Sequence, residues 1–156
     1  MPAKIIPTIP FTAQAYADNQ AEYDRLKNLR VEVMERLKAA REMGDLSENG
    51  AYKYAKFELG DIGRRMRHLK HLLINGYVAE ASSDSSTVDF GRKVKLQSGN
   101  SEFTFFLVSE HESDLSHNKL SINSPIGRAI VGKKMGDTVT VETPRGTSAY
   151  TILEIQ

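Results

Sequence analysis

The sequence predicts an α+β protein with an N-terminal antiparallel α-helical coiled-coil hairpin and a C-terminal antiparallel sheet that carries a short helix. Apolar residues recur at steps of three and four up to about residue 75, which is the period of an amphipathic helix. Short strand-like runs separated by turn residues follow. We therefore expect two domains, a hairpin over residues 1–76 and a globular domain over residues 77–156.

Two helical runs form the predicted hairpin. The first extends from about Ala13 to Met43, and in the second the steps of three and four alternate without a slip, as at the a and d positions of a coiled coil. Only a few residues separate the runs, so the helices must be antiparallel neighbours. Gly44 suits the end of the first helix because glycine takes a left-handed conformation without penalty. The expected seam comprises Tyr16, Tyr23, Leu26, Leu29, Val33, Leu37 and Ala40 in the first helix and Tyr52, Ala55, Leu59, Ile62, Met66, Leu69 and Leu73 in the second.

The C-terminal half has the pattern of a small antiparallel sheet. Turn residues such as Gly99-Asn100 and Gly136-Asp137 separate its alternating runs. Ser124 and Pro125 predict the N-cap and first residue of a short helix that ends at Gly132. The expected strands are Tyr77–Ala81, Lys93–Gln97, Phe103–Val108, Lys119–Ile122, Thr138–Glu142 and Ser148–Ile155.

Composition narrows the class of protein. The chain has 156 residues, is 40% hydrophobic and 26% charged, and has a net charge of +1, so it lacks a global field for nucleic acid. No apolar run approaches the roughly 20 residues of a membrane helix, and residues 1–11 do not resemble an export signal. Cysteine is absent, which excludes disulfides and thiolate chemistry. We expect a cytoplasmic monomer without membrane contact.

Two carboxylates, Asp45 and Glu48, lie in the short break between the helices. Carboxylate oxygens suit magnesium, which usually takes only one or two from a protein and completes its shell with water or phosphate. Two carboxylates at the end of a stiff hairpin therefore make an incomplete magnesium site that another macromolecule would finish. The alternative is structural: Asp-x-x-Glu is a variant of the capping box, in which Asp45 would cap the second helix.

Four segments resemble the Gre family of bacterial transcript-cleavage factors, and its GreA-like members more than its GreB-like ones. The tip segment Arg41–Asn49, followed by Tyr52, resembles one family signature, and Ser121–Ala129 resembles the other. The similarity extends from about Thr8 to Ile155, including the opening Ile9–Thr12 and the closing Thr143–Gly146. Two signatures in the expected order make the resemblance specific.

The resemblance implies a function carried out on another molecule. Gre factors insert their coiled coil into the secondary channel of RNA polymerase, where the tip helps to hold a magnesium ion and a water for hydrolysis of backtracked RNA near its 3′ end. Asp45 and Glu48 match the two tip carboxylates of the family. The chain would then be no enzyme itself, and magnesium would be held jointly with the polymerase rather than tightly bound by the free protein.

Further residues acquire expected roles from the same resemblance. The RNA-contacting basic patch of the family maps to Arg41 and Lys56, with Lys53 beside them. The globular half resembles the FKBP-like domain that docks on the polymerase, with its docking loop at Asn123, Ser124 and Pro125. Each role has a structural alternative. The cations could serve only to keep the surface of a coiled coil solvated, and Ser124-Pro125 could serve only to cap a helix.

One departure from the family pattern and four rival functions are weighed. Ala51 stands where the family often has a further acid, which predicts weaker metal recruitment and leaves room for a channel-binding inhibitor. A folding helper that uses the hairpin as a clamp is a second rival. A free-standing nuclease is disfavoured because the chain supplies too few ligands for two ions, and His68 and His71 lack a third metal ligand. Prolyl-isomerase activity is disfavoured because the aromatic residues of the globular half alternate as strand residues do.

Overall fold

The computed structural model describes residues 2–45 and 48–156. The chain divides into two compact units. One comprises the residues up to Thr8 together with Tyr16–Gly76, and the other comprises Ile9–Ala15 together with Tyr77–Gln156. The boundary expected between residues 76 and 77 stays a prediction. No helix in the described part of the chain is long and apolar enough to cross a membrane.

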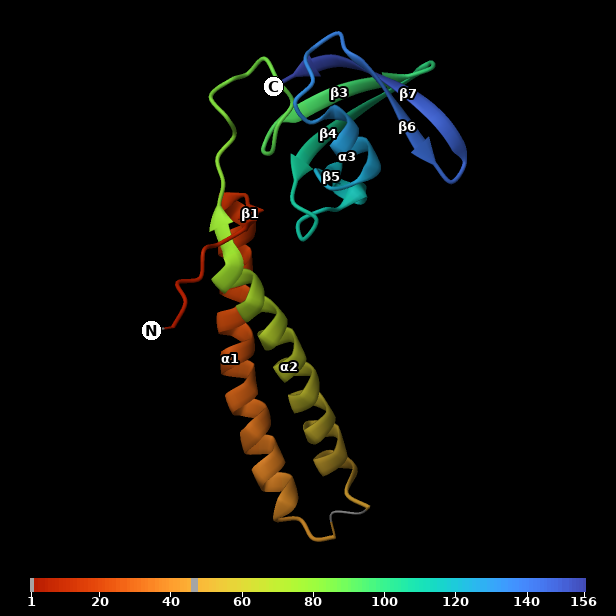
Figure 1. Cartoon of the computed structure of the whole chain (residues 1–156). Coiled ribbons are helices and arrows are strands. Elements are labelled where there is room, and N and C mark those ends of the chain that lie inside the picture. The colour runs from red at the N-terminus through yellow and green to blue at the C-terminus, as the bar shows by residue number, and fades with distance from the viewer. Residues whose placement is uncertain (1, 46–47) are drawn as a thin grey trace. The chain divides into compact units, whose positions relative to one another are not determined.

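The first unit is the expected helical hairpin. Helices α1 (Ala13–Arg41) and α2 (Gly50–Asn75) lie side by side (Figure 1). A single row of buried side chains holds them together, and it follows the predicted seam as far as Leu69. Near the end of α2 the seam shifts by one residue, because Leu72 rather than Leu73 is buried. The buried residues of this cluster are Leu26, Val33, Ala55, Ile62 and Met66, flanked by the partly buried Tyr23, Leu29, Leu37, Leu59 and Leu69.

Helix α1 ends at Arg41, two residues before the predicted end. The amide groups of Glu42 and Met43 still donate to the carbonyl groups of Ala39 and Ala40, at 3.2 Å each, so the chain continues for one tight turn. Gly44 then has a φ of 112°, in the region that favours glycine. This confirms its expected role at the helix end.

A two-stranded sheet was not fully predicted. Strand β1 (Ile9–Phe11) pairs with β2 (Gly76–Val78), and three residues with a proline among them give little strand signal. Thr12 follows β1 and is held within the second unit by Glu112, whose carboxylate oxygens accept from the Thr12 hydroxyl at 2.6 Å and from its amide at 3.2 Å. The side chain of Glu112 is only 6% exposed.

The second unit contains a five-stranded sheet in the order β5-β4-β3-β7-β6, with helix α3 against one side (Figure 1). The neighbouring strands β4-β3, β3-β7 and β7-β6 pair antiparallel; β5 runs parallel to β4, which corrects the expectation of a purely antiparallel sheet. Residues 109–118 make this possible, since they first carry the chain back along β4 and a 3₁₀ turn over Leu115–His117 then reverses it again before β5. The elements are β3 (Lys93–Ser98), β4 (Ser101–Val108), β5 (Lys119–Ser121), α3 (Pro125–Ile130), β6 (Thr138–Thr143) and β7 (Gly146–Ile155).

Alternation along the strands builds the core of this unit. Val94 and Leu96 of β3 are fully buried, whereas Lys93 and Lys95, which alternate with them, reach solvent. Phe105 and Tyr150 pack against the same core, in keeping with the structural role expected for the aromatic residues. The fold class is thus the expected one, a helical hairpin followed by a curled sheet with a short helix.

Candidate functional site at the hairpin tip

The two predicted metal ligands lie at the end of the hairpin where α1 and α2 are joined. Asp45 and Glu48 are both exposed. Leu46 and Ser47 of the tip signature lie outside the described residues. Exposed carboxylates of this kind are chemically suited to magnesium, and they leave most of a coordination shell to other ligands. Within the described residues, no group of three or more His, Asp or Glu side chains could hold a metal ion.

The N-cap of α2 is Asn49, so the alternative in which Asp45 caps this helix is wrong. The side-chain oxygen of Asn49 accepts from the amide of Tyr52 at 3.1 Å, and its side-chain nitrogen donates to the carbonyl group of Ala40 at 2.7 Å. One side chain therefore starts α2 and links it to the last turn of α1. Asn49 could have been predicted as the N-cap, because asparagine is among the preferred N-cap residues. Only Asp45 was considered for this position, because it belongs to the acidic pair.

Next to the tip, the cationic groups of Arg41 and Lys56 both lie over the aromatic ring of Tyr52. The guanidinium carbon of Arg41 and the ammonium nitrogen of Lys56 each lie 5.8 Å from the centroid of the Tyr52 ring. Arg41 ends α1 and Lys56 lies in the second turn of α2, so the structure brings together two of the predicted RNA-binding residues. Lys53 is exposed and makes no ring contact among the described residues. Tyr52 was predicted as a seam residue, and its role as a platform for the two cations was missed.

The expected docking loop is a tightly bonded helix start in the second unit. Ser124 accepts from the amide of Gly127 at 3.0 Å and donates to the carbonyl group of Ser121 at 2.6 Å. The amide of Asn123 donates to the Ser121 hydroxyl at 3.0 Å. Pro125 occupies the first helical turn, as predicted. Asn123 and Pro125 remain exposed, so this rigid loop presents two side chains to solvent.

Gly127 explains why the loop has this sequence. A Cβ atom at this position would lie 2.1 Å from the carbonyl oxygen of Ser121, far closer than real contacts allow. Any other residue would push α3 away from the end of β5. The glycine of the second signature therefore has a packing role, which its position in the motif did not reveal.

The chain matches family models over both halves. Residues 9–78 match the model described as "Transcription elongation factor, N-terminal", and residues 83–156 match "Transcription elongation factor, GreA/GreB, C-term". The chain belongs to the GreA/GreB family of transcription elongation factors. This confirms the resemblance that the two signatures indicated.

Individual relatives are similar over almost their whole length. The transcription elongation factor GreA of Thermosipho africanus is 40% identical over 152 residues, which cover 96% of this chain and 97% of that protein. The GreA of Thermosipho melanesiensis is 41% identical over 95% of this chain and 96% of that protein. Among solved structures, the GreA factor homolog 1 (Gfh1) protein of Thermus thermophilus is 22% identical, with a TM-score of 0.44 over 95% of this chain and 98% of that one.

Proposed function

We propose that this elongation factor binds RNA polymerase, places the tip of its hairpin in the secondary channel and stimulates hydrolysis of backtracked nascent RNA. Asp45 and Glu48 would contribute oxygen ligands to a magnesium ion that the polymerase also holds. When bound, that ion supplies an activated water and charge stabilisation for phosphodiester hydrolysis. The polymerase owns the reaction and this chain assists it, in the cytoplasm where transcription takes place in bacteria.

The proposal rests mainly on one observation at the tip: the residue that caps α2 is a different residue from the two exposed carboxylates. Asn49 provides the N-cap of α2, so neither Asp45 nor Glu48 is the residue that caps this helix. Both carboxylates are exposed at the joined ends of two long helices. A site in that place can act only on a molecule that surrounds it.

Two further groups support the same function. Arg41 and Lys56, held over the Tyr52 ring, would meet the phosphates of an RNA 3′ end that approaches the tip. Lys53 would add charge without a fixed position. Asn123, Ser124 and Pro125 would contact the polymerase outside the channel, through a loop that its own hydrogen bonds hold rigid.

The test is RNA cleavage in a stalled, backtracked elongation complex with magnesium. The comparison includes no factor, the natural protein, Asp45→Asn, and Glu42→Gln as a matched control that removes an exposed carboxylate just before the tip pair. The natural protein and Glu42→Gln are expected to accelerate cleavage at the 3′ end, whereas Asp45→Asn is expected to bind the polymerase without acceleration.

Equal cleavage with and without factor, with the polymerase still bound, would contradict the proposal. The chain would then occupy the channel as an inhibitor, and the exposed Ala51, where the family often has an acid, is the residue that favours this second candidate. Cleavage of RNA by the chain without polymerase would also contradict the assignment of the catalytic centre.

A further inference from the structure

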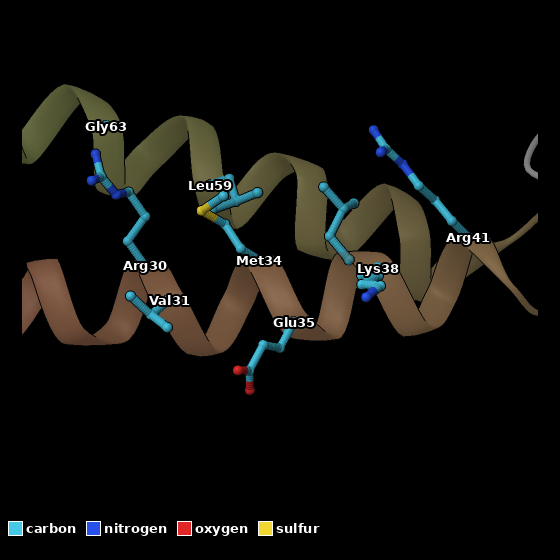
Figure 2. Close-up of a pocket in the computed structure, with 9 residues that line it drawn as sticks. Arg30, Val31, Met34, Glu35, Lys38, Arg41, Leu59 and Gly63 are labelled. Atoms are coloured by element: carbon cyan, nitrogen blue, oxygen red, sulfur yellow. The ribbon is translucent and has the colours of Figure 1, made fainter.

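An open groove follows one side of the hairpin between α1 and α2, away from the tip carboxylates. It has a volume of about 830 Å³ and is lined by residues of both helices. Figure 2 shows that Arg30 extends toward Gly63 and that Met34 lies beside Leu59, so side chains of α1 reach across to α2. The residues that matter for its chemistry are Arg30, Val31, Met34, Lys38, Leu59 and Gly63.

The floor of the groove is apolar although it faces solvent. Val31 is 55% exposed and Met34 is 54% exposed, and they lie one turn apart on α1, outside the buried seam. Leu37 and Leu59 continue the apolar surface at the edge of the seam. Clustered exposed hydrophobic side chains of this kind mark interaction surfaces more often than single ones do. Methionine adapts readily to a partner surface because its side chain is unbranched and flexible.

The rim of the groove is basic. Arg30, Lys38 and Arg41 border it, and none of them forms an ion pair within the described residues. The acid in the lining, Glu35, points away from α2 in Figure 2. Arg67, which lines an adjoining depression together with Arg30 and Gly63, adds to the positive side.

Gly63 lines the groove on the α2 side and has no side chain to fill it. A Cβ atom there would meet only the end of the Arg67 side chain, at 3.4 Å, so a partner reaches the helix backbone once the flexible Arg67 and Arg30 side chains move aside. The segment Arg30–Arg41 is about 16 Å long at 1.5 Å per residue, or about three helical turns. These dimensions suit a third helix lying along the other two.

We infer that this groove binds an amphipathic helix of a partner protein, whose apolar side covers Val31, Met34 and Leu59 and whose flanks carry Asp or Glu. An amphipathic helix in an apolar groove is a recurrent mode of recognition, and acidic flanks complement the basic rim. Nucleic acid is disfavoured because a phosphate backbone would leave the exposed apolar floor without a partner. The inference does not depend on transcript cleavage.

The test uses a defined probe. A fluorescein-labelled synthetic peptide of about four helical turns carries leucines at i, i+3 and i+7 with glutamates beside them, and a second peptide has the same composition in scrambled order. Fluorescence anisotropy measures binding of each to the full-length protein. The ordered peptide is expected to bind at least about tenfold more tightly than the scrambled one, a difference of about 1.4 kcal/mol.

Matched variants locate the probe. The double variant Val31→Gln and Met34→Gln is expected to weaken binding about tenfold, since it removes the apolar floor. Phe57→Gln is the control, because Phe57 is 71% exposed on α2 but does not line the groove. Gly63→Leu, which fills the groove and leaves α1 intact, is a second route to the same loss, with Gly60→Leu as its control. Circular dichroism verifies that each variant keeps its helix content.

Three outcomes would overturn the inference. One is equal binding of the ordered and scrambled peptides, and another is retention of the ordered peptide by both groove variants. The third is tighter binding of a single-stranded RNA of matched charge that is lost in the same variants, which would make the groove a nucleic-acid site.

Discussion

The two sides of the hairpin differ in how their charges are satisfied. On one side, ion pairs cross between the helices: Arg36 lies 3.0 Å from Glu58 and Arg65 lies 2.6 Å from Glu22. On the other side, the cations that border the groove form no such pair within the described residues, and exposed apolar side chains lie between them. The same two helices and the same seam support both sides.

This difference separates stabilisation from recognition. Side chains that pair with each other hold the helices together and offer little to a partner. Side chains that remain unpaired contribute little to the fold and keep their charge and surface for another molecule. The groove side also continues to the tip, where Arg41 and Lys56 share the Tyr52 ring.

The largest expected change in the free energy of unfolding comes from a substitution in the buried seam between the two helices. Leu26→Ala removes a fully buried side chain and is expected to lower the free energy of unfolding by about 2–5 kcal/mol. Val31→Ala, on the exposed groove side, is the control and is expected to lower it by less than about 1 kcal/mol. Urea denaturation followed by circular dichroism measures both. If the two losses were equal, Val31 would belong to the core and the groove side would not be a free surface.

Two glycines inside α2 offer substitutions that are expected to stabilise the hairpin, and only one of the two lies on the groove side. Gly63→Ala and Gly60→Ala each replace a glycine inside α2 and are expected to raise the free energy of unfolding by up to about 1 kcal/mol, because alanine favours helix. Only Gly63→Ala narrows the groove, so only this variant is expected to weaken the acidic peptide. Thermal unfolding and anisotropy separate the two effects, and equal weakening by Gly60→Ala would place the peptide elsewhere.

The ion-paired side is expected to contribute less than the seam. Glu22→Gln removes the partner of both Arg25 and Arg65 and is expected to cost about 0.2–1 kcal/mol of unfolding free energy, as exposed pairs do. The loss should shrink as salt is added, because salt screens these charges. An effect of this size that is independent of salt would mean that Glu22 acts through packing instead.

The carboxylate of Glu22 also makes the free energy of unfolding depend on pH, in a direction that follows from its pKa. The pKa of Glu22 lies below its ordinary value of 4.5, first because Arg25 donates hydrogen bonds to it and then through the charges of Arg25 and Arg65. A lowered folded-state pKa means that the stabilisation is complete above the unfolded-state pKa and is lost as pH falls through the folded-state pKa. The difference in stability between the natural protein and Glu22→Gln should therefore diminish below about pH 4.5.

The smallest expected effect on stability is that of Met34→Gln. This side chain is more than half exposed, so the free energy of unfolding should change by no more than about 0.5 kcal/mol. The peptide affinity should fall nevertheless. A variant that loses both stability and affinity would show that Met34 supports the hairpin rather than a partner.

The periodicity of apolar residues allowed much of this fold to be predicted. The features that were missed are pairings between strands, which depend on hydrogen bonds that the periodicity does not reveal. The seam of α2 follows from steps of three and four, since that spacing puts Ala55, Ile62 and Met66 on one side of a helix. Strand β1 could not be predicted, because it is a three-residue segment with a proline whose partner β2 lies far along the chain. The parallel pairing of β5 was missed because β5 directly follows β4, and a parallel pair usually needs a longer crossover connection.

The candidate site divides in the same way. The carboxylates at the tip and the cations near it were predicted, and their roles stay predictions. The N-cap Asn49, the ring platform Tyr52 and the requirement for Gly127 depend on atoms brought together by the fold. The groove escaped prediction because Val31 and Met34 lie outside the seam, and one sequence cannot show whether an exposed apolar pair meets a partner.

The central claim is that the tip shares a metal ion with the polymerase, and a magnesium titration of RNA cleavage in the backtracked complex tests it most directly. The natural protein and Glu42→Gln are expected to reach half-maximal stimulation at the same magnesium concentration, whereas Glu48→Gln should require more, because one ligand is missing. An unchanged magnesium requirement in Glu48→Gln, with full stimulation at every concentration, would contradict the claim.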